Sequence, residues 1–236
     1  MNGESWVYRR GGALLGMVRE RPEEATANAV NRYALRPLAP EEYEVFSLDL
    51  CHNQVDRHHS RFPDEELERI NELVVGRPLM ERHDLRESLP RGTFFQSRLH
   101  REGDRLSVRP DVYVLRTGEN AGFILNIEGG VYRETSIGFA FRLPECSVCG
   151  RDIRRCEHVP GRTYEGETCH YLMREVVDVI EGSVVASGSQ GTHFVAWDAG
   201  EHVARGLDPA EALALARRGW PAHPWTARGA GLWARE

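Results

Sequence analysis

Four of the five cysteines of this chain lie between residues 146 and 169, together with a histidine at a spacing typical of metal ligands. Cys146 and Cys149 form a Cys-x-x-Cys pair, in which two thiolates on one tight turn can bind the same metal ion. Gly150 suits that turn. Cys156 and His158 lie two residues apart, so on an extended segment both side chains point the same way. Thiolate and imidazole ligands in this pattern favour tetrahedral Zn2+.

The sequence leaves the fourth ligand of this site open. Five residues are candidates: Cys146, Cys149, Cys156, His158 and Cys169. We expect the first three to bind, with either His158 or Cys169 completing the set, and His170 to point to the opposite side from Cys169. Four protein ligands fill the coordination shell, so the zinc is expected to fix a loop and to take no part in chemistry.

A second candidate is the serine in a strand expected over residues 134–141, which follows a Gly-Gly turn. Because side chains alternate along a strand, its larger residues share one face: Thr135, Ile137, Phe139 and Phe141. The opposite face carries the small residues Ser136, Gly138 and Ala140. The apolar face is the core side. The small-residue face either packs under a helix or leaves room for a group to lie against the backbone beside one exposed hydroxyl.

Composition narrows the class of protein. The chain has 236 residues, of which 41% are hydrophobic and 28% charged, as in ordinary soluble globular proteins. Its net charge of −6 argues against a general nucleic-acid binder. No apolar run approaches the roughly 20 residues of a membrane span, and the first ten residues lack a signal-peptide core, so we expect a cytosolic protein.

An odd cysteine count then argues against a disulfide framework, and the isolated Cys51 is expected to be buried.

The pattern of elements predicts a β-rich α+β core in which strands outnumber helices. The expected strands, besides 134–141, cover residues 45–50, 79–83, 93–99, 104–115 and 175–186. Helices are expected from Asp64 to Gly76 and over 208–219, and residues 121–127 form either a helix or a strand. Three histidines in a polar connection are expected to be loop residues: His52, His58 and His59.

Separated motifs in the chain resemble those of the phage prohead (capsid maturation) proteases, serine proteases related in fold to the herpesvirus assemblins. The motifs are Val55-Asp56-Arg57 with Phe62, Gly76-Arg77-Pro78 with His83, Pro90-x-Gly92, Thr135-Ser136-Ile137-Gly138-Phe139, and Glu181-x-Ser183-Val184-Val185. The resemblance covers about residues 45 to 190, in the family's order. Some phage members look similar in also carrying a Cys-x-x-Cys-Gly insertion after the Ser-Ile-Gly-Phe strand.

The resemblance implies a twisted β-barrel with peripheral helices and a Ser-His-Glu triad. Ser136 matches the family's nucleophile and His83 its base, while Glu181 stands at the place of the acidic third member. The carboxylates Asp178, Asp84 and Glu134 are rivals for that third role, and His58 is a further alternative, since the herpesvirus enzymes use a second histidine. With this resemblance the chain divides into an arm (1–44), a protease-like core (45–195) with a zinc-binding insertion (143–172), and a C-terminal helix and tail (196–236).

The activity implied is that of a serine endopeptidase that needs no cofactor for chemistry. Its substrates would be the scaffolding protein, the major capsid protein and the protease itself, inside an assembling procapsid in the host cytoplasm. Self-association is expected, and membrane or nucleic-acid partners are not. The alternative is a catalytically inactive, zinc-braced structural or assembly protein of the virion with the same fold.

Overall fold

The computed structural model describes residues 6–8, 14–17, 24–84 and 86–195, and the chain divides into two units. One unit, Met1–Glu23 with Ala196–Glu236, contains the antiparallel pair β1 (Trp6–Tyr8) and β2 (Leu14–Met17). The other unit spans Glu24–Val195 and contains every candidate site residue. The helix predicted over residues 208–219 lies outside the described residues.

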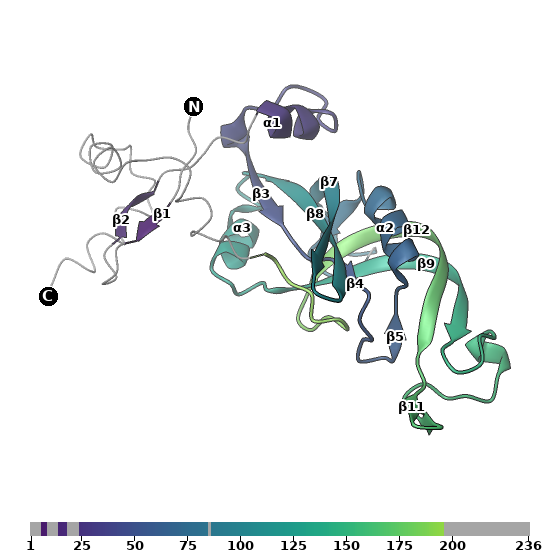
Figure 1. The fold of residues 1–236 in the computed structure, drawn as a ribbon. Helices are drawn as coiled ribbons and strands as arrows, with labels where there is room; N and C mark the ends of the chain where they lie inside the picture. Colours follow the sequence, from purple (N-terminus) through teal and green to yellow (C-terminus); the bar gives the residue numbers. More distant parts are fainter. Residues whose placement is uncertain (1–5, 9–13, 18–23, 85, 196–236) are drawn as a thin grey trace, which may run out of the picture. The chain divides into compact units, whose positions relative to one another are not determined.

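The larger unit is a β-rich α+β structure built on one mixed eight-stranded sheet (Figure 1). The strand order is β3-β8-β7-β6-β12-β5, with β4 also paired to β8 and β9 paired to β12. Its strands are β3 (Tyr43–Ser47), β4 (Cys51–His52), β5 (Ser60–Arg61), β6 (Pro78–Met80), β7 (Pro90–Glu102), β8 (Arg105–Leu115), β9 (Glu134–Cys146) and β12 (Tyr171–Val185). The sheet is open, because no pairing between strands of the described residues closes it into a barrel.

Few helices accompany the sheet: α1 (Glu24–Asn31), α2 (Asp64–Leu73) and α3 (Ala121–Glu128). Helix α2 begins at Asp64 as predicted, with three acidic residues in its first turn, where they complement the helix dipole. The chain leaves α2 through Gly76, whose φ of 87° favours glycine. Residues 121–127, left open between helix and strand, are helical in α3.

The core lies between α2 and the strands β7, β8 and β12, which supply most of its buried side chains. Ile70 of α2, Val112 of β8 and Val179 of β12 are fully buried there. The apolar face predicted for the strand over 134–141 packs on this core through Ile137, Phe139 and Phe141. Cys51 is also fully buried, as predicted, and burial raises the pKa of its thiol.

Two predicted strands end earlier than expected. The strand predicted over residues 79–83 ends at Met80, so His83 lies in the bend that follows β6 and not on the strand itself. Met80 pairs with Pro90, which has no N–H group to extend the ladder. The strand predicted over residues 45–50 divides into β3 and a connection to β4, where Leu48 forms a bridge to Phe194 instead.

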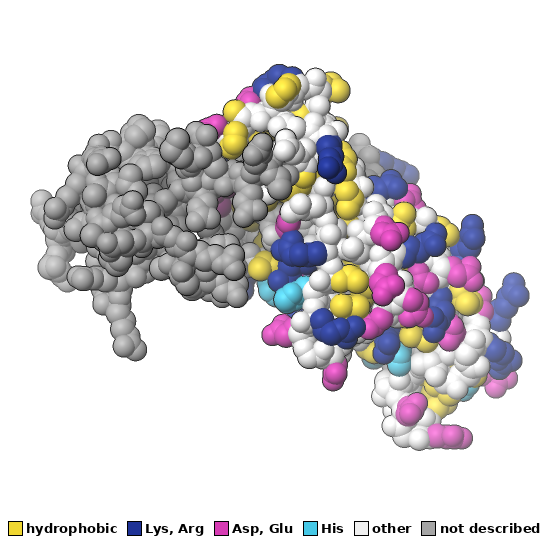
Figure 2. Space-filling view, turned by 45° about the horizontal axis from the view of Figure 1, so that its top comes forward, with side chains coloured by type: hydrophobic (Ala, Val, Ile, Leu, Met, Phe, Trp, Pro, Cys, Tyr) yellow, Lys and Arg dark blue, Asp and Glu magenta, His cyan; other side chains and the backbone are white. Residues whose placement is uncertain are grey.

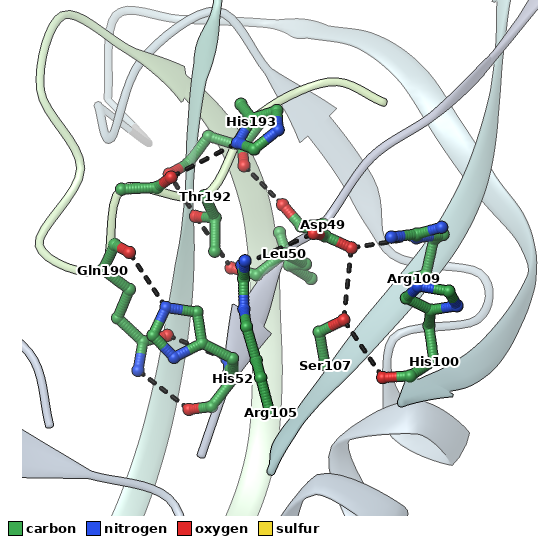
Figure 3. A network of polar contacts seen from close by, with 12 residues as sticks. Asp49, Leu50, His52, His100, Arg105, Ser107, Arg109, Gln190, Thr192 and His193 are labelled. Carbon is green, nitrogen blue, oxygen red and sulfur yellow. Dashed lines mark hydrogen bonds and ion pairs between the residues drawn. The ribbon is translucent and has the colours of Figure 1, made fainter. Parts of the chain in front are cut away.

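His52 is buried in β4 and is not the loop residue that the sequence suggested (Figure 3). Its Nδ1 accepts a hydrogen bond from the Gln54 N–H, so its Nε2–H donates to the carbonyl of Gln190 at 2.9 Å. The Gln190 side-chain oxygen accepts the His52 N–H, and the Gln190 side-chain nitrogen donates to the His52 carbonyl. Burial lowers the pKa of His52, and the neutral ring joins β4 to the segment around Gln190.

A buried carboxylate supports the same region of the fold (Figure 3). Asp49 is 4% exposed and accepts hydrogen bonds from Arg109 Nε at 2.9 Å and Ser107 Oγ at 3.2 Å, with Arg105 at 3.4 Å. The two guanidinium groups and the hydroxyl compensate the cost of burying its charge. The network fixes the connection between β3 and β4 against β8.

Residues 192–195 lie between the start of β9 and the connection that follows β3. On one side, the N–H groups of Thr135 and Phe194 donate to the carbonyls of Thr192 and Arg133, respectively. On the other side, the N–H groups of Asp49 and Val195 donate to the carbonyls of His193 and Ser47. These hydrogen bonds place the loop before residue 192 beside the strand that carries Ser136.

Candidate functional site

The bend after β6 brings His83 against Glu181 of β12. The Nδ1 atom of His83 lies 2.5 Å from Oε1 of Glu181, whose side chain is only 3% exposed, while the His83 side chain is 40% exposed. The hydrogen bond to Glu181 raises the pKa of His83, while burial acts in the opposite direction and the carboxylate charge adds to the rise. With Nδ1 engaged by the carboxylate, the Nε2 atom of His83 is available to another group.

The Glu181 carboxylate lies over the small-residue face of β9. Glu181 is directly opposite Gly138, where an added Cβ would lie 2.2 Å from Oε1 of Glu181. The second carboxylate oxygen accepts a hydrogen bond from Ser183, which is fully buried two residues along β12. The face of Ser, Gly and Ala therefore does leave room for a group against the backbone, and that group is the Glu181 carboxylate.

Ser136 lies on β9, two residues before the Gly138 that faces this carboxylate. It is opposite Ser183 in the β9–β12 ladder, while Gly138 is opposite Glu181. Because side chains alternate along a strand, Ser136 and Gly138 share a face. Ser136 is half-buried, and none of the hydrogen bonds found within the described residues joins it to His83.

The rivals of Glu181 have other partners. Asp178 pairs with Arg77 at 2.6 Å, and the Asp84 carboxylate accepts N–H groups of the turn that follows it. Glu134 accepts the Gly188 N–H at 2.7 Å. His58 is exposed in the connection after β4. Among these acidic residues, Glu181 is the one that contacts His83.

Sequence reasoning did not identify the part of Ser183 in this site. Its signal was present in the spacing, because residues two apart on a strand point to the same side, as Glu181 and Ser183 do. A buried carboxylate also requires more than one hydrogen-bond donor, and a hydroxyl on the same strand face is the simplest source.

The cysteine-rich segment forms a compact cluster at the other end of the β9–β12 ladder. Four ligand atoms lie within 4.8 Å of one another, and they belong to Cys146, Cys149, Cys156 and His158. Three thiols and one imidazole are a donor set that tetrahedral zinc prefers, and they lie close enough together that this cluster could bind a metal such as zinc. Cys169 is fully buried but falls outside this group of four.

Local turns bring these four residues together. Cys146 ends β9, and the Gly150 N–H donates to its carbonyl at 2.9 Å, with Gly150 at a φ of 69°. The pKa of the Cys149 thiol is lowered to about 6, chiefly by a hydrogen bond with the backbone of Arg151. The lower pKa favours the thiolate form that a metal requires. Glycine at this turn supports the knuckle expected from the sequence.

The histidine of the cluster fits a metal-ligating role. The Nδ1 atom of His158 is buried and has no hydrogen-bond partner among the described residues, as expected of a nitrogen that is reserved for a metal. The Tyr164 ring packs edge-on against the imidazole with ring centroids 4.6 Å apart. This packing orients His158 toward the three thiols.

The two candidate sites are far apart along the same pair of strands. Ser136 faces Ser183 near one end of the ladder, whereas Cys146 faces Tyr171 at the other end. Ten residues of extended chain cover about 30 Å, so a metal held by the cysteine cluster would not reach Ser136. Figure 1 shows the cysteine-rich segment, with β11 (Glu167–Thr168), as an extension beyond the ends of β9 and β12.

A scan against protein-family models finds no match, and searches of the curated proteins and of the solved structures find no significant match. None of the helices in the described part of the chain is long and apolar enough to cross a membrane.

Proposed function

We propose that this protein is a serine endopeptidase of the phage head-maturation class, with Ser136 as nucleophile, His83 as general base and Glu181 as the orienting acid. The observation that carries the proposal is the contact between His83 Nδ1 and the buried Glu181 carboxylate, on the strand paired with the one that bears Ser136. A serine hydroxyl is a weak nucleophile and requires such a base, and a carboxylate on the far ring nitrogen fixes the tautomer of that base.

In this mechanism Ser136 Oγ attacks the carbonyl carbon of a peptide bond while Nε2 of His83 takes the hydroxyl proton. Glu181 stabilises the resulting imidazolium, which then gives the proton to the leaving amine. A water molecule, activated by the same histidine, hydrolyses the acyl-enzyme and releases Ser136. The raised pKa of His83 favours the protonated intermediate state.

The finer fold that we propose is a twisted β-barrel of assemblin type. Its support is the segment 192–195, whose backbone hydrogen bonds link residues 47–49 to residues 133–135. The cysteine cluster would hold structural Zn2+, through Cys146, Cys149, Cys156 and His158, with Cys169 as the further candidate. The proposed substrates are scaffolding protein, major capsid protein and the chain itself, cleaved by a self-associating enzyme inside the procapsid in the host cytoplasm.

The second candidate function is a catalytically inactive, zinc-braced structural or assembly protein of the virion. One observation favours it, namely that no hydrogen bond in the described part of the chain joins Ser136 to His83. A nucleic-acid-binding role has less support. Basic and acidic side chains are interspersed on the face drawn in Figure 2, and acidic residues outnumber basic ones by 36 to 30 in the whole chain.

Co-expression of the full chain with its neighbouring scaffold and capsid gene products tests the proposal. Intact masses would be compared among the wild type, Ser136→Ala, His83→Ala and the matched control His100→Ala on β7. We expect defined truncations in the wild type and in His100→Ala that vanish in the other two variants. Identical uncut masses in all four would overturn the peptidase and favour the structural protein.

A further inference from the structure

A pocket of about 230 Å3 opens beside Ser136 on the opposite face of β9 from Glu181. The core-facing residues of β9 line it, together with Leu50, Phe62 and Met173, all of which are at least 95% buried. Phe62 and Phe139 lie with ring centroids 4.9 Å apart inside this lining. The floor of the pocket is therefore largely apolar, and the hydroxyls of Thr135 and Thr192, which also line it, donate to backbone carbonyls.

The rim of the pocket is polar. Asp56, His58, Ser189 and Gln190 line it and are half-buried or exposed. The Asp56 carboxylate accepts the N–H groups of His58 and Ser60, which fixes this side of the rim. None of the described residues that line the pocket is Lys or Arg, so an acidic group would meet the charge of Asp56 without a compensating cation.

Ser136 links the pocket to the Glu181 carboxylate through the pairing of β9 with β12. It lines the pocket, and its partner across the ladder is Ser183, whose hydroxyl holds the Glu181 carboxylate. A group that occupies the pocket therefore lies beside Ser136 on β9. Ligand pockets commonly combine such an apolar interior with a few polar groups at defined positions.

We propose that this pocket binds a large apolar side chain of the peptide substrate, of leucine, methionine or phenylalanine size, close to the scissile bond. The inference rests on the proposed peptidase function and names the substrate feature that the site selects. An apolar cavity of about 150 Å3 holds a benzene molecule, so a pocket of this volume accommodates a phenyl ring or a branched aliphatic side chain. Acidic side chains are excluded by the apolar floor and by Asp56.

The first arm of the test measures binding without catalysis. The full-length Ser136→Ala protein, labelled at its methyl groups, is titrated with N-acetyl-leucinamide, N-acetyl-phenylalaninamide and N-acetyl-glutamic acid amide in NMR experiments. We expect the first two amides to shift the methyl signals of Leu50, Ile137 and Met173, and the glutamic acid derivative to leave them unchanged. Absence of shifts with all three, or equal shifts with all three, would overturn the proposal.

Two tryptophan variants show whether the pocket is responsible. Ser189→Trp narrows the rim, whereas Ala186→Trp adds the same side chain to an exposed position of the same loop outside the pocket. We expect Ser189→Trp to abolish the methyl shifts and Ala186→Trp to retain them. Shifts that persist in both variants would place the ligand elsewhere and contradict the proposal.

The second arm measures cleavage of peptides by the full chain with Ser136 intact. One methylene in an apolar pocket changes kcat/KM by roughly 10- to 200-fold, so replacing leucine by alanine at the recognised position should lower it at least about 10-fold. Methyl shifts without cleavage of any peptide would refute the peptidase while leaving the pocket as an apolar binding site. Cleavage that is indifferent to all apolar side chains would refute the pocket alone.

Discussion

A single methyl group at position 138 should disconnect the proposed catalytic dyad. In Gly138→Ala the new Cβ would lie 2.2 Å from Oε1 of Glu181, the same oxygen that contacts His83 Nδ1 at 2.5 Å. The carboxylate must therefore move by roughly 1 Å, and a misplacement of that size costs on the order of 10²-fold in rate. The lost contact involves a charged group, and because His83 is 40% exposed we expect the free energy of unfolding to fall by only about 1–2 kcal/mol.

The pKa of His83, measured from its imidazole NMR signals, is the assay of choice because it requires no substrate. In the wild type it should lie above 6.5, and in Gly138→Ala it should fall toward that ordinary value. Gly122→Ala is the matched control, since an added Cβ there has no heavy atom within 4 Å. A folded Gly138→Ala protein with an unchanged His83 pKa would refute the arrangement described for Glu181.

Three further predictions follow, two from the hydrogen bonds of Glu181 and one from the cysteine cluster. In Ser183→Ala, the buried Glu181 carboxylate loses a donor, so urea denaturation should show a free energy of unfolding lower by about 1–3 kcal/mol; no change would contradict that hydrogen bond. The pKa of His83 is higher in the folded protein than its ordinary value of 6.5. The ion pair of His83 with Glu181 therefore stabilises the folded protein fully below pH 6.5, and this stabilisation is lost as the pH rises through the folded-state pKa. The destabilisation by Glu181→Gln should therefore be larger at pH 5.5 than at pH 9, and an equal or opposite difference would exclude the ion pair. Cys149→Ser should reduce bound zinc from one ion per chain and lower Tm, while the His83 pKa stays unchanged; unaltered zinc content by metal analysis would remove Cys149 from the ligand set.

The sequence predicted the elements that carry the candidate site better than the site's internal geometry. Residues 64–73 form a helix because acidic residues at its start and a glycine beyond its end give local signals, and local signals can be read in a sequence. The alternation over residues 134–141 likewise predicted which face of β9 packs on the core. These are properties of neighbouring residues.

What the sequence did not predict depends on pairing between distant segments. The end of β6 before His83 follows from the pairing of Met80 with Pro90, and the burial of His52 follows from its hydrogen bonds to Gln190. The bonds of residues 192–195 to two distant segments follow from neither periodicity nor composition. The choice of Glu181 over its acidic rivals came from the family resemblance, and the contact of its carboxylate with His83 is a tertiary feature.

Ser183 and the pocket show the same limit. The strand spacing placed Ser183 on the face of Glu181, but only the pairing of β9 with β12 shows that this face lies against Gly138. The pocket beside Ser136 combines residues from the segment 50–62, from β9, from β12 and from the segment 189–192. Because this pocket forms only when four separate segments come together, no single stretch of the sequence predicts it.

If Ser136 is an activated nucleophile, as proposed, it should react covalently with a fluorophosphonate. Intact mass and peptide mapping would locate the adduct in the full-length protein. We predict one phosphonyl group per chain, on Ser136, absent in Ser136→Ala and strongly reduced in His83→Ala and Glu181→Gln. An unmodified wild-type chain, or labelling that is indifferent to His83, would contradict it.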